Sequence, residues 1–141
     1  NLNTTGAVLS PFDSYQLIRG LKTLSLRMER STENAQEIVA FLEQSPAVKE
    51  VLYTGRGGMI SFKVADEKRI PHILNTLKVF SFAESLGGVE SLITYPTTQT
   101  HADIPAEVRH SYGLTDDLLR LSIGIEDARD LIEDLRQALE G

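Results

Sequence analysis

The sequence contains no cysteine. This absence excludes a disulfide framework, a cysteine-ligated metal site and a thiol nucleophile. The chain also lacks any apolar run near the roughly 20 residues that a membrane-spanning helix needs, and its N-terminus has no signal-peptide pattern. We therefore expect a cytoplasmic protein with no membrane partner.

Basic runs interleaved with aromatic residues are absent as well. The chain has 20 acidic and 14 basic residues, for a net charge of −6. Because nucleic-acid-binding proteins present basic patches to phosphates, nucleic acid is not an expected partner. With 141 residues, 41% hydrophobic and 24% charged, the composition is typical of one globular domain. The chain starts at Asn1 without a methionine, which suggests a processed chain, a tag remnant or a piece of something longer.

Hydrophobic spacing predicts that the N-terminal part is helical. Ser10 is a candidate N-cap, and Pro11 suits the first position of a helix. Apolar residues recur at helical spacing over 17–28 and again over 35–42. Only residues 31–32 separate these patterns, so they form either two helices or one long bent helix.

The rest of the chain predicts short strands mixed with helices. We expect strands at 48–53, 59–64, 80–83, 91–95 and 119–125, and helices at 67–77, at 105–111 and from 126 onward. The first two strands form a hairpin around a glycine-rich turn at 54–58. This order predicts an α+β fold of two layers, in which helices cover one side of a small, mostly antiparallel sheet.

The strand at 119–125 carries the most informative pattern. Its odd positions are all aliphatic, and its even positions are Arg120, Ser122 and Gly124. Because successive side chains of a strand point to opposite faces, Arg120 stands among small neighbours on the face away from the aliphatic residues. Such an arginine has room for a carboxylate or a phosphate, which suits its planar fork. The alternative is a solvated arginine on a half-exposed strand.

Other candidate sites are weak. The histidines, His72, His101 and His110, have no metal-ligand spacing. Thr100-His101 lies near Asp103, but no serine stands in a nucleophile-elbow context, so a hydrolase relay is not expected. Gly87-Gly88 lacks the third glycine of a dinucleotide site. No lysine context indicates a Schiff-base role, so these residues can hold a substrate but include no group to transform it.

Several separated segments together resemble a known family. The segments are Leu9–Tyr15, Leu17–Leu24, Glu84–Leu92, Thr100–Ala102 and Leu119–Asp127. In this order they resemble the C-terminal part of the Cys/Met-metabolism enzymes that use pyridoxal phosphate, and the resemblance runs over essentially the whole chain. It implies the fold of the C-terminal domain of fold-type I enzymes. The family's cofactor lysine lies in a Ser-x-Thr-Lys motif upstream of these segments, and that motif is absent here.

The resemblance also implies roles for individual residues. Residues 1–141 would be the C-terminal substrate-binding domain, inactive alone, with pyridoxal 5'-phosphate bound by the missing N-terminal part. Arg120 resembles the arginine that clamps the substrate α-carboxylate, and Ser85 the serine that orients the cofactor lysine and the carboxylate. Glu84 resembles an acid that meets a distal ammonium, and Thr100 lies near the substrate channel.

The branch of the family is indicated by two features. Glu84 and the run from Tyr95 to Pro105 look most like bacterial γ-synthases that also act as acetylhomoserine thiol-lyases. These enzymes convert O-acylhomoserine and cysteine or sulfide to cystathionine or homocysteine in methionine biosynthesis, as homotetramers. The alternatives are a fragment of a cystathionine γ- or β-lyase, and a non-catalytic module for amino-acid binding or oligomerisation.

Overall fold

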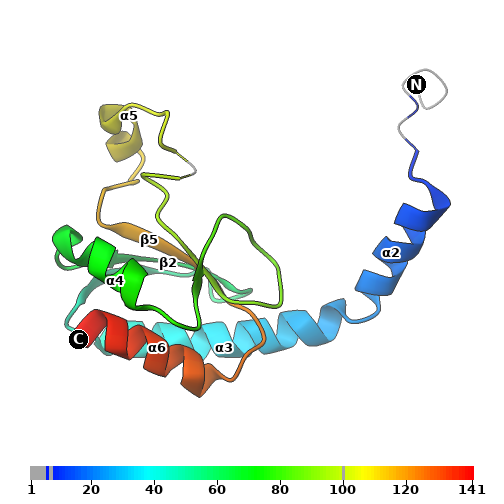
Figure 1. Cartoon of the computed structure of the whole chain (residues 1–141), viewed down its shortest axis with the longest axis horizontal. Coiled ribbons are helices and arrows are strands. Elements are labelled where there is room, and N and C mark those ends of the chain that lie inside the picture. Colours follow the sequence, from blue (N-terminus) through cyan, green and yellow to red (C-terminus); the bar gives the residue numbers. More distant parts are fainter. Residues whose placement is uncertain (1–5, 7, 100) are drawn as a thin grey trace.

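Helices and short strands alternate along the chain in the computed structural model, which describes residues 6, 8–99 and 101–141 (Figure 1). The elements are α2 (Pro11–Leu21), α3 (Leu24–Gln44), β1 (Val48–Leu52), β2 (Met59–Val64), the 3-10 turn η1 (Glu67–Arg69), α4 (Ile70–Thr76), β3 (Ser81–Phe82), β4 (Leu92–Thr94), α5 (Ala106–Ser111), β5 (Leu118–Ser122) and α6 (Ala128–Glu140). None of the helices in these described ranges is long and apolar enough to cross a membrane.

The strands form one five-stranded sheet in the order β1-β2-β5-β4-β3. All neighbours are antiparallel except β3 and β4, which run parallel. The predicted hairpin of β1 and β2 and the mostly antiparallel sheet are therefore confirmed. In the register, Arg120 of β5 lies opposite Ser61 of β2 and opposite Thr94 of β4.

Helices α3, α4 and α6 lie on one side of this sheet (Figure 1). Apolar residues of the helices and strands pack between the two layers, and Ile38, Phe62, Leu121 and Leu135 are fully buried there. Burial of such aliphatic and aromatic side chains is the main source of stability in a domain of this size. The predicted two-layer α+β fold is confirmed.

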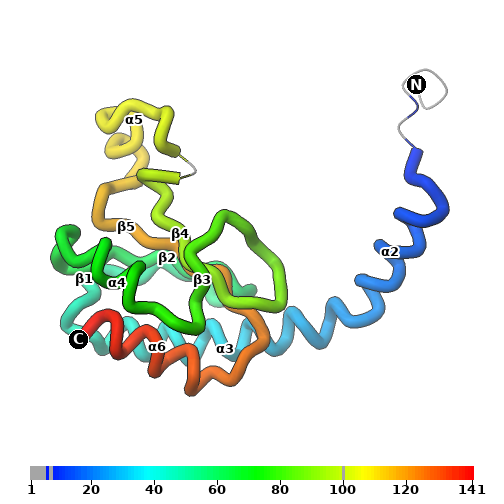
Figure 2. The backbone as a smooth tube through the Cα atoms, in the orientation of Figure 1, coloured from blue at the N-terminus to red at the C-terminus, as the bar shows by residue number. Residues whose placement is uncertain are grey.

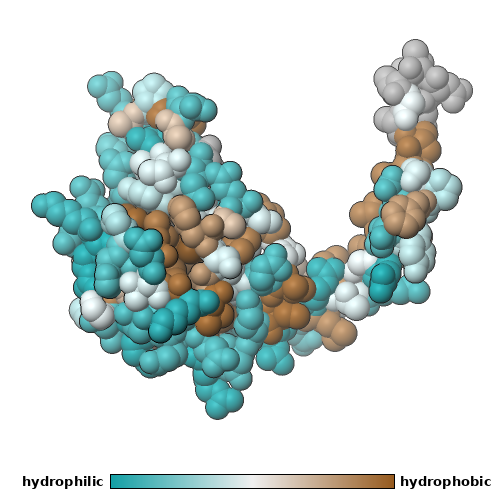
Figure 3. All heavy atoms as spheres, in the orientation of Figure 1, coloured by the Kyte–Doolittle hydropathy of each residue, from teal (hydrophilic) through white to brown (hydrophobic). Residues whose placement is uncertain are grey.

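Helix α2 projects away from this body (Figure 1). It begins as predicted, because the Ser10 side chain accepts a hydrogen bond from the Asp13 N–H. None of its residues is buried, and Figure 3 shows its apolar side chains on the surface. The apolar spacing over 17–28 therefore does not mark a core-facing helix in this chain.

The break between the first two helices lies at Lys22-Thr23 rather than at residues 31–32. Ser31 lies inside α3, where its hydroxyl donates to the Met28 carbonyl of the preceding turn. Because that polar side chain is satisfied within the helix, it does not end the helix. Thr23 instead leaves helical geometry, with φ −112° and ψ 3°.

Two other boundaries differ from the prediction. Strand β5 ends at Ser122, and Ile125 lies outside the sheet and is exposed, so only three of the four odd-position aliphatic residues face the core. The backbone leaves the sheet there because the Ile125 N–H donates to the carbonyl of Val89, in the loop before β4. The predicted helix at 67–77 is a 3-10 turn followed by the short helix α4.

Candidate functional site

The two faces of β5 have different surroundings. Leu119, Leu121 and Ile123 belong to the buried core between the sheet and the helices. Arg120 and Ser122 point to the other face, which α3, α4 and α6 do not cover (Figure 1). The sequence prediction for these residues is confirmed, with the exception of Ile125.

The loop between β3 and β4 crosses this second face. It starts at Ala83, whose carbonyl accepts a hydrogen bond of 3.0 Å from the Thr94 hydroxyl, and Thr94 is the register partner of Arg120. Four residues later, the Gly87 N–H donates to the Ser122 hydroxyl at 3.3 Å. The chain therefore reaches from edge strand β3 to the end of β5 within residues 83–87. Figure 2 shows this loop projecting beside β3 and β4. Glu84 and Ser85 lie on this segment.

Arg120 is half-buried. Across the described ranges (6, 8–99 and 101–141), no hydrogen bond or ion pair engages its guanidinium group, although most other arginines near the body of the fold are paired in this way. Removing an arginine partly from water without a partner costs free energy, and an anion that binds the planar fork offsets this cost. The geometry therefore favours binding of a carboxylate or a phosphate.

The structure shows fewer contacts for the other predicted site residues than for Arg120 and its strand. Glu84 and Ser85 are exposed and lie on the loop between Ala83 and Gly87. Thr100 lies outside the described residues. The flanking segment is fixed to the end of β4, because the Gln99 side chain accepts a hydrogen bond from the Tyr95 N–H. The structure thus places Arg120 on the open face of the sheet, and Glu84 and Ser85 on the loop whose ends, Ala83 and Gly87, bond to Thr94 and Ser122.

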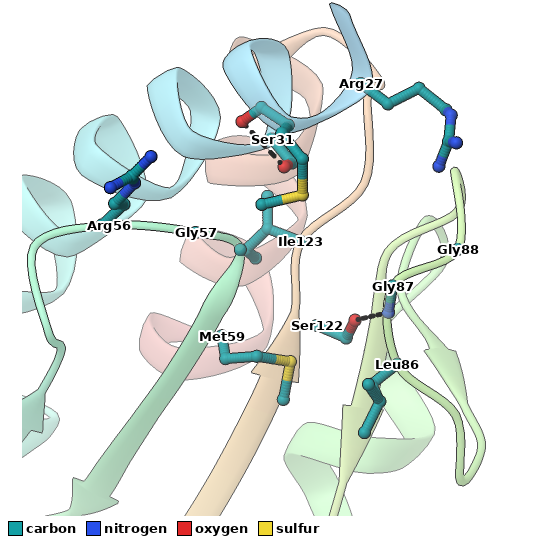
Figure 4. A pocket seen from close by; sticks show the side chains of 12 residues that line it. Arg27, Ser31, Arg56, Gly57, Met59, Leu86, Gly87, Gly88, Ser122 and Ile123 are labelled. Carbon is teal, nitrogen blue, oxygen red and sulfur yellow. Dashed lines mark hydrogen bonds between the residues drawn. The ribbon is translucent and has the colours of Figure 1, made fainter. Parts of the chain in front are cut away.

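A pocket of about 260 Å³ lies at the end of the sheet, between α3, the start of β2, the end of β5 and the loop at 86–88. Figure 4 shows the hydrogen bond between Ser122 and Gly87 inside it, with Met59 on the strand side and Leu86 on the loop side. Arg27 and Arg56 lie at its rim. Arg120, Glu84 and Ser85 do not line this pocket, so the arginine stands on an open part of the face.

A buried polar cluster fixes the segment after β4. Arg109 is buried, donates to the Thr97 carbonyl at 2.9 Å and lies 3.7 Å from a carboxylate oxygen of Asp116. The Tyr95 hydroxyl donates to the Asp116 carbonyl at 2.7 Å. Burial, followed by the negative charge of Asp116, raises the pKa of Tyr95. A neutral, hydrogen-bonded tyrosine of this kind has a structural role here.

The structure describes side-chain contacts of two of the histidines. His110 lies 3.5 Å from Asp116, and His72 contacts Thr76 within its own helix. Within the described part of the chain, no group of three or more histidine, aspartate or glutamate side chains could hold a metal ion.

Sequence reasoning missed the residues that hold the loop in place. The sequence pattern indicates no role in a site for Glu126, but the Glu126 carboxylate accepts hydrogen bonds from the N–H and hydroxyl of Ser91. The side chain of Asn34 donates to the carbonyls of Gly124 and Glu126. The available signal was a polar Asn34 beside Ala35 on the core-facing stripe of a helix, where an unpartnered amide would be costly.

A model of the Cys/Met metabolism PLP-dependent enzyme family matches residues 1–140. The chain belongs to this family. Its relatives include the cystathionine gamma-synthase/O-acetylhomoserine (thiol)-lyase of Bacillus subtilis, 58% identical over 97% of this chain and 37% of that relative. The cystathionine gamma-synthase of Haemophilus influenzae is 57% identical over 96% of this chain and 37% of that relative. The cystathionine gamma-lyase of Bacillus subtilis is 51% identical over 98% of this chain and 41% of that relative.

Solved structures of the family share the fold. The gamma-lyase of Micromonospora echinospora is 36% identical, with a TM-score of 0.92 over 99% of this chain and 41% of that structure. The gamma-lyase of Lactobacillus plantarum complexed with L-serine is 36% identical, with a TM-score of 0.86 over 98% of this chain and 40% of that structure. The chain therefore spans about two fifths of the length of the family members it matches.

The lysines of this chain are either ion-paired or exposed. Pyridoxal phosphate is held through a Schiff base to a lysine. The lysine on the Arg120 face of the sheet, Lys63, is paired with Glu50 at 3.0 Å, and Lys49 is paired with Asp117 at 3.2 Å. Lys22, Lys68 and Lys78 are exposed. We therefore assign no cofactor-binding lysine to this chain and derive no reaction step through the cofactor.

Proposed function

We propose that residues 1–141 are the C-terminal substrate-binding domain of a pyridoxal-phosphate enzyme of Cys/Met metabolism, and that Arg120 binds the α-carboxylate of its amino-acid substrate. The observation that carries this proposal is the half-buried guanidinium group without a partner among the described residues, on the open face of the sheet. Family membership supplies the substrate class, since carboxylates are common to all amino acids.

The residues around Arg120 supply the rest of the binding site in this proposal. A carboxylate that binds the guanidinium fork by two hydrogen bonds has a fixed position and orientation. The Ser85 hydroxyl, on the loop above, is a hydrogen-bond donor for the same carboxylate. Glu84 provides a negative charge for a distal ammonium group, and Thr100 completes the channel side of the site. The chain thus binds and orients a substrate whose chemistry occurs elsewhere.

The cofactor-bearing part of the enzyme is the proposed partner of this chain. Bound pyridoxal phosphate acts as an electron sink for the carbon next to the amino group. Helix α2 leaves Phe12, Ile18 and Leu21 largely exposed among the described residues. Such an apolar face is suited to packing against the remaining three fifths of the enzyme. The complete enzyme is proposed to be a homotetramer in the cytoplasm.

We propose γ-replacement as the reaction of the complete enzyme. The acyloxy group of O-acylhomoserine leaves as a carboxylate, and the sulfur of cysteine or sulfide bonds to the γ-carbon with loss of its proton. The products are cystathionine or homocysteine, which are precursors in methionine biosynthesis. The two synthases support this branch, because their alignments need no gaps in this chain. The alignments extend over 137 and 136 positions, and these cover 97% and 96% of the chain.

The alternative is a cystathionine γ- or β-lyase. A gamma-lyase is 51% identical to the chain and a beta-lyase 47% identical. Their alignments extend over 154 positions although they match 98% of a chain of 141 residues, so they contain gaps that the synthase alignments lack. This difference favours the synthase branch over the lyase branch.

A hybrid enzyme tests the proposal. It joins this chain to the part of the Bacillus subtilis relative that the chain does not match. Arg120→Lys should lower kcat/KM for O-acetylhomoserine on the order of 100-fold, because a single ammonium group cannot reproduce the planar fork and the substrate loses its orientation. Arg129→Lys, at a side chain that is 90% exposed, is the matched control and should have little effect.

Three outcomes separate the hypotheses. An Arg120→Lys hybrid with an unchanged KM for O-acetylhomoserine contradicts the carboxylate clamp. Higher activity on cystathionine than on O-acetylhomoserine plus cysteine contradicts the synthase branch in favour of a lyase. A folded hybrid without activity on any of these substrates favours the non-catalytic module.

A further inference from the structure

The loop that carries Glu84 and Ser85 contains no regular secondary structure, so its position depends on individual hydrogen bonds. At its start, the Ala83 N–H donates to the Ile93 carbonyl at 3.2 Å. At its end, the Val89 carbonyl accepts from the Ile125 N–H at 2.9 Å. Both anchors are backbone groups, which any sequence provides. A side-chain network at Ser91 adds the specific attachment.

Ser91 is 1% exposed, and both its backbone N–H and its hydroxyl form hydrogen bonds. Its N–H donates to one carboxylate oxygen of Glu126 at 2.6 Å, and its hydroxyl donates to the other at 2.8 Å. The same hydroxyl accepts from the Gly124 N–H at 2.9 Å. Because hydrogen bonds to a carboxylate are stronger than neutral ones, this contact holds the end of the loop firmly against the end of β5.

The backbone after β5 is fixed in turn by α3. The Asn34 side chain, 2% exposed, donates to the Gly124 carbonyl at 3.1 Å and to the Glu126 carbonyl at 2.8 Å. A Cβ atom at Gly124 would come within 2.1 Å of the Val89 carbonyl oxygen, so only glycine allows the loop to approach this closely. The loop, the strand of Arg120 and α3 therefore meet in one buried polar network.

We propose that Ser91 and Glu126 are positioning residues, which set the place of Ser85 relative to Arg120 by fixing the Glu84–Gly88 loop. This inference rests on the carboxylate clamp proposed above. Neither residue touches the substrate in this scheme. Without their hydrogen bonds the loop keeps its backbone contacts and the single hydrogen bonds from Thr94 to Ala83 and from Gly87 to Ser122. Its end is then no longer fixed to the end of β5 by a carboxylate, and Ser85 and Arg120 no longer bind the same carboxylate together.

Ser91→Ala is the sharpest variant, because it removes the hydroxyl without adding volume. Ser45→Ala is the matched control: Ser45 is 6% exposed at the end of α3, and its hydroxyl has no hydrogen-bond partner among the described residues. In this chain, we expect Ser91→Ala to increase amide hydrogen exchange at Gly87, Ser91 and Gly124, and to leave exchange at Ile38 in α3 unchanged. Ser45→Ala should change none of these rates.

In the hybrid enzyme, we expect Ser91→Ala to raise KM for O-acetylhomoserine on the order of 10-fold, since small misplacements of binding groups have effects of this size. A double-variant cycle separates positioning from general weakening of the fold. If Ser91 acts through the clamp, adding Ser91→Ala to Arg120→Lys changes KM by less than about 2-fold, because the interaction has already been removed.

Each remaining outcome overturns the inference. If Ser91→Ala has the same KM and the same exchange rates as Ser45→Ala, Ser91 does not position the loop, and the clamp itself stands as long as Arg120→Lys is impaired. If the effects of the two variants multiply in the double variant, Ser91 acts independently of Arg120. If Arg120→Lys has a normal KM, the clamp is wrong and the positioning role falls with it.

Discussion

Asp117 lies just before β5, and its charge is stabilised by two side chains. Thr115 and Lys49 donate hydrogen bonds to its carboxylate, the latter at 3.2 Å. Burial raises the pKa of Asp117, but these hydrogen bonds outweigh burial and hold its pKa below the ordinary value. The folded state therefore favours the charged form. The resulting stabilisation is present above the pKa of the unfolded chain, about 4, and is lost as the pH falls through the lower folded value.

We expect Asp117→Asn to lower the free energy of unfolding by about 1 kcal/mol at pH 7, the usual scale for a partly exposed ion pair. The loss should shrink as the pH falls below about 4, where the unfolded chain takes up the proton, and it should vanish once the folded carboxyl is neutral as well. Urea unfolding at pH 7 and pH 3 measures the difference. Asp103→Asn, at an exposed residue of the segment before α5, should have no effect at either pH. An equal loss for Asp117→Asn at both pH values would show that the charge contributes nothing.

Single residues of the site were predictable from sequence to different degrees. Arg120 was found because alternation along one strand is a local property, and the structure confirms its face. Glu126 was not, because its role comes from hydrogen bonds to Ser91, which is 35 positions away in the sequence. No periodic pattern reports such a contact.

Among the helices and strands, too, the features that depend on local spacing were predictable and those that depend on distant contacts were not. The hairpin of β1 and β2 and the helix α6 follow from local spacing and were predicted. The bounds of α3 were not, since the continuation of the helix through Ser31 depends on side-chain satisfaction and on packing against the body. Hydrophobic spacing also predicts an amphipathic α2. It does not show that the apolar face stays exposed, as the described residues leave it.

Helix α2 should be the least stable element of this chain. An isolated helix of its 11 residues is marginal in water, and α2 buries no residue. We expect its amides to exchange hydrogen almost without protection, whereas the amides around Ile38 in α3 exchange only through global unfolding. Deletion of residues 1–22 should change Tm by less than about 2 °C, because little buried surface is lost.

The matched control for this deletion is Ile38→Ala, which should lower Tm clearly because Ile38 is fully buried. Strong protection of α2 would contradict the prediction. A dependence of that protection on protein concentration would then identify a second copy of the chain as the covering surface.

At the scale of the whole molecule, one core connects both layers. The fully buried residues of α3, β2, β5 and α6 belong to a single cluster, and Tyr53 and Tyr95 pack against it. A single core of this kind favours unfolding in one cooperative step. The body from α3 to α6 should therefore unfold as a unit, although the chain spans only about two fifths of its relatives.

Leu121→Ala and Leu26→Ala test this cooperativity with the same chemical change at two places. Leu121 is fully buried in the centre of the sheet, so its truncation should lower the free energy of unfolding by about 2–5 kcal/mol. Leu26 is 68% exposed on α3, and its truncation should stay within about 0.5 kcal/mol. In urea, helical circular dichroism and tyrosine fluorescence should give the same midpoint for each variant. If the two probes separated in Leu121→Ala, the layers would unfold independently, and the sheet that carries Arg120 would not depend on its helices for its position.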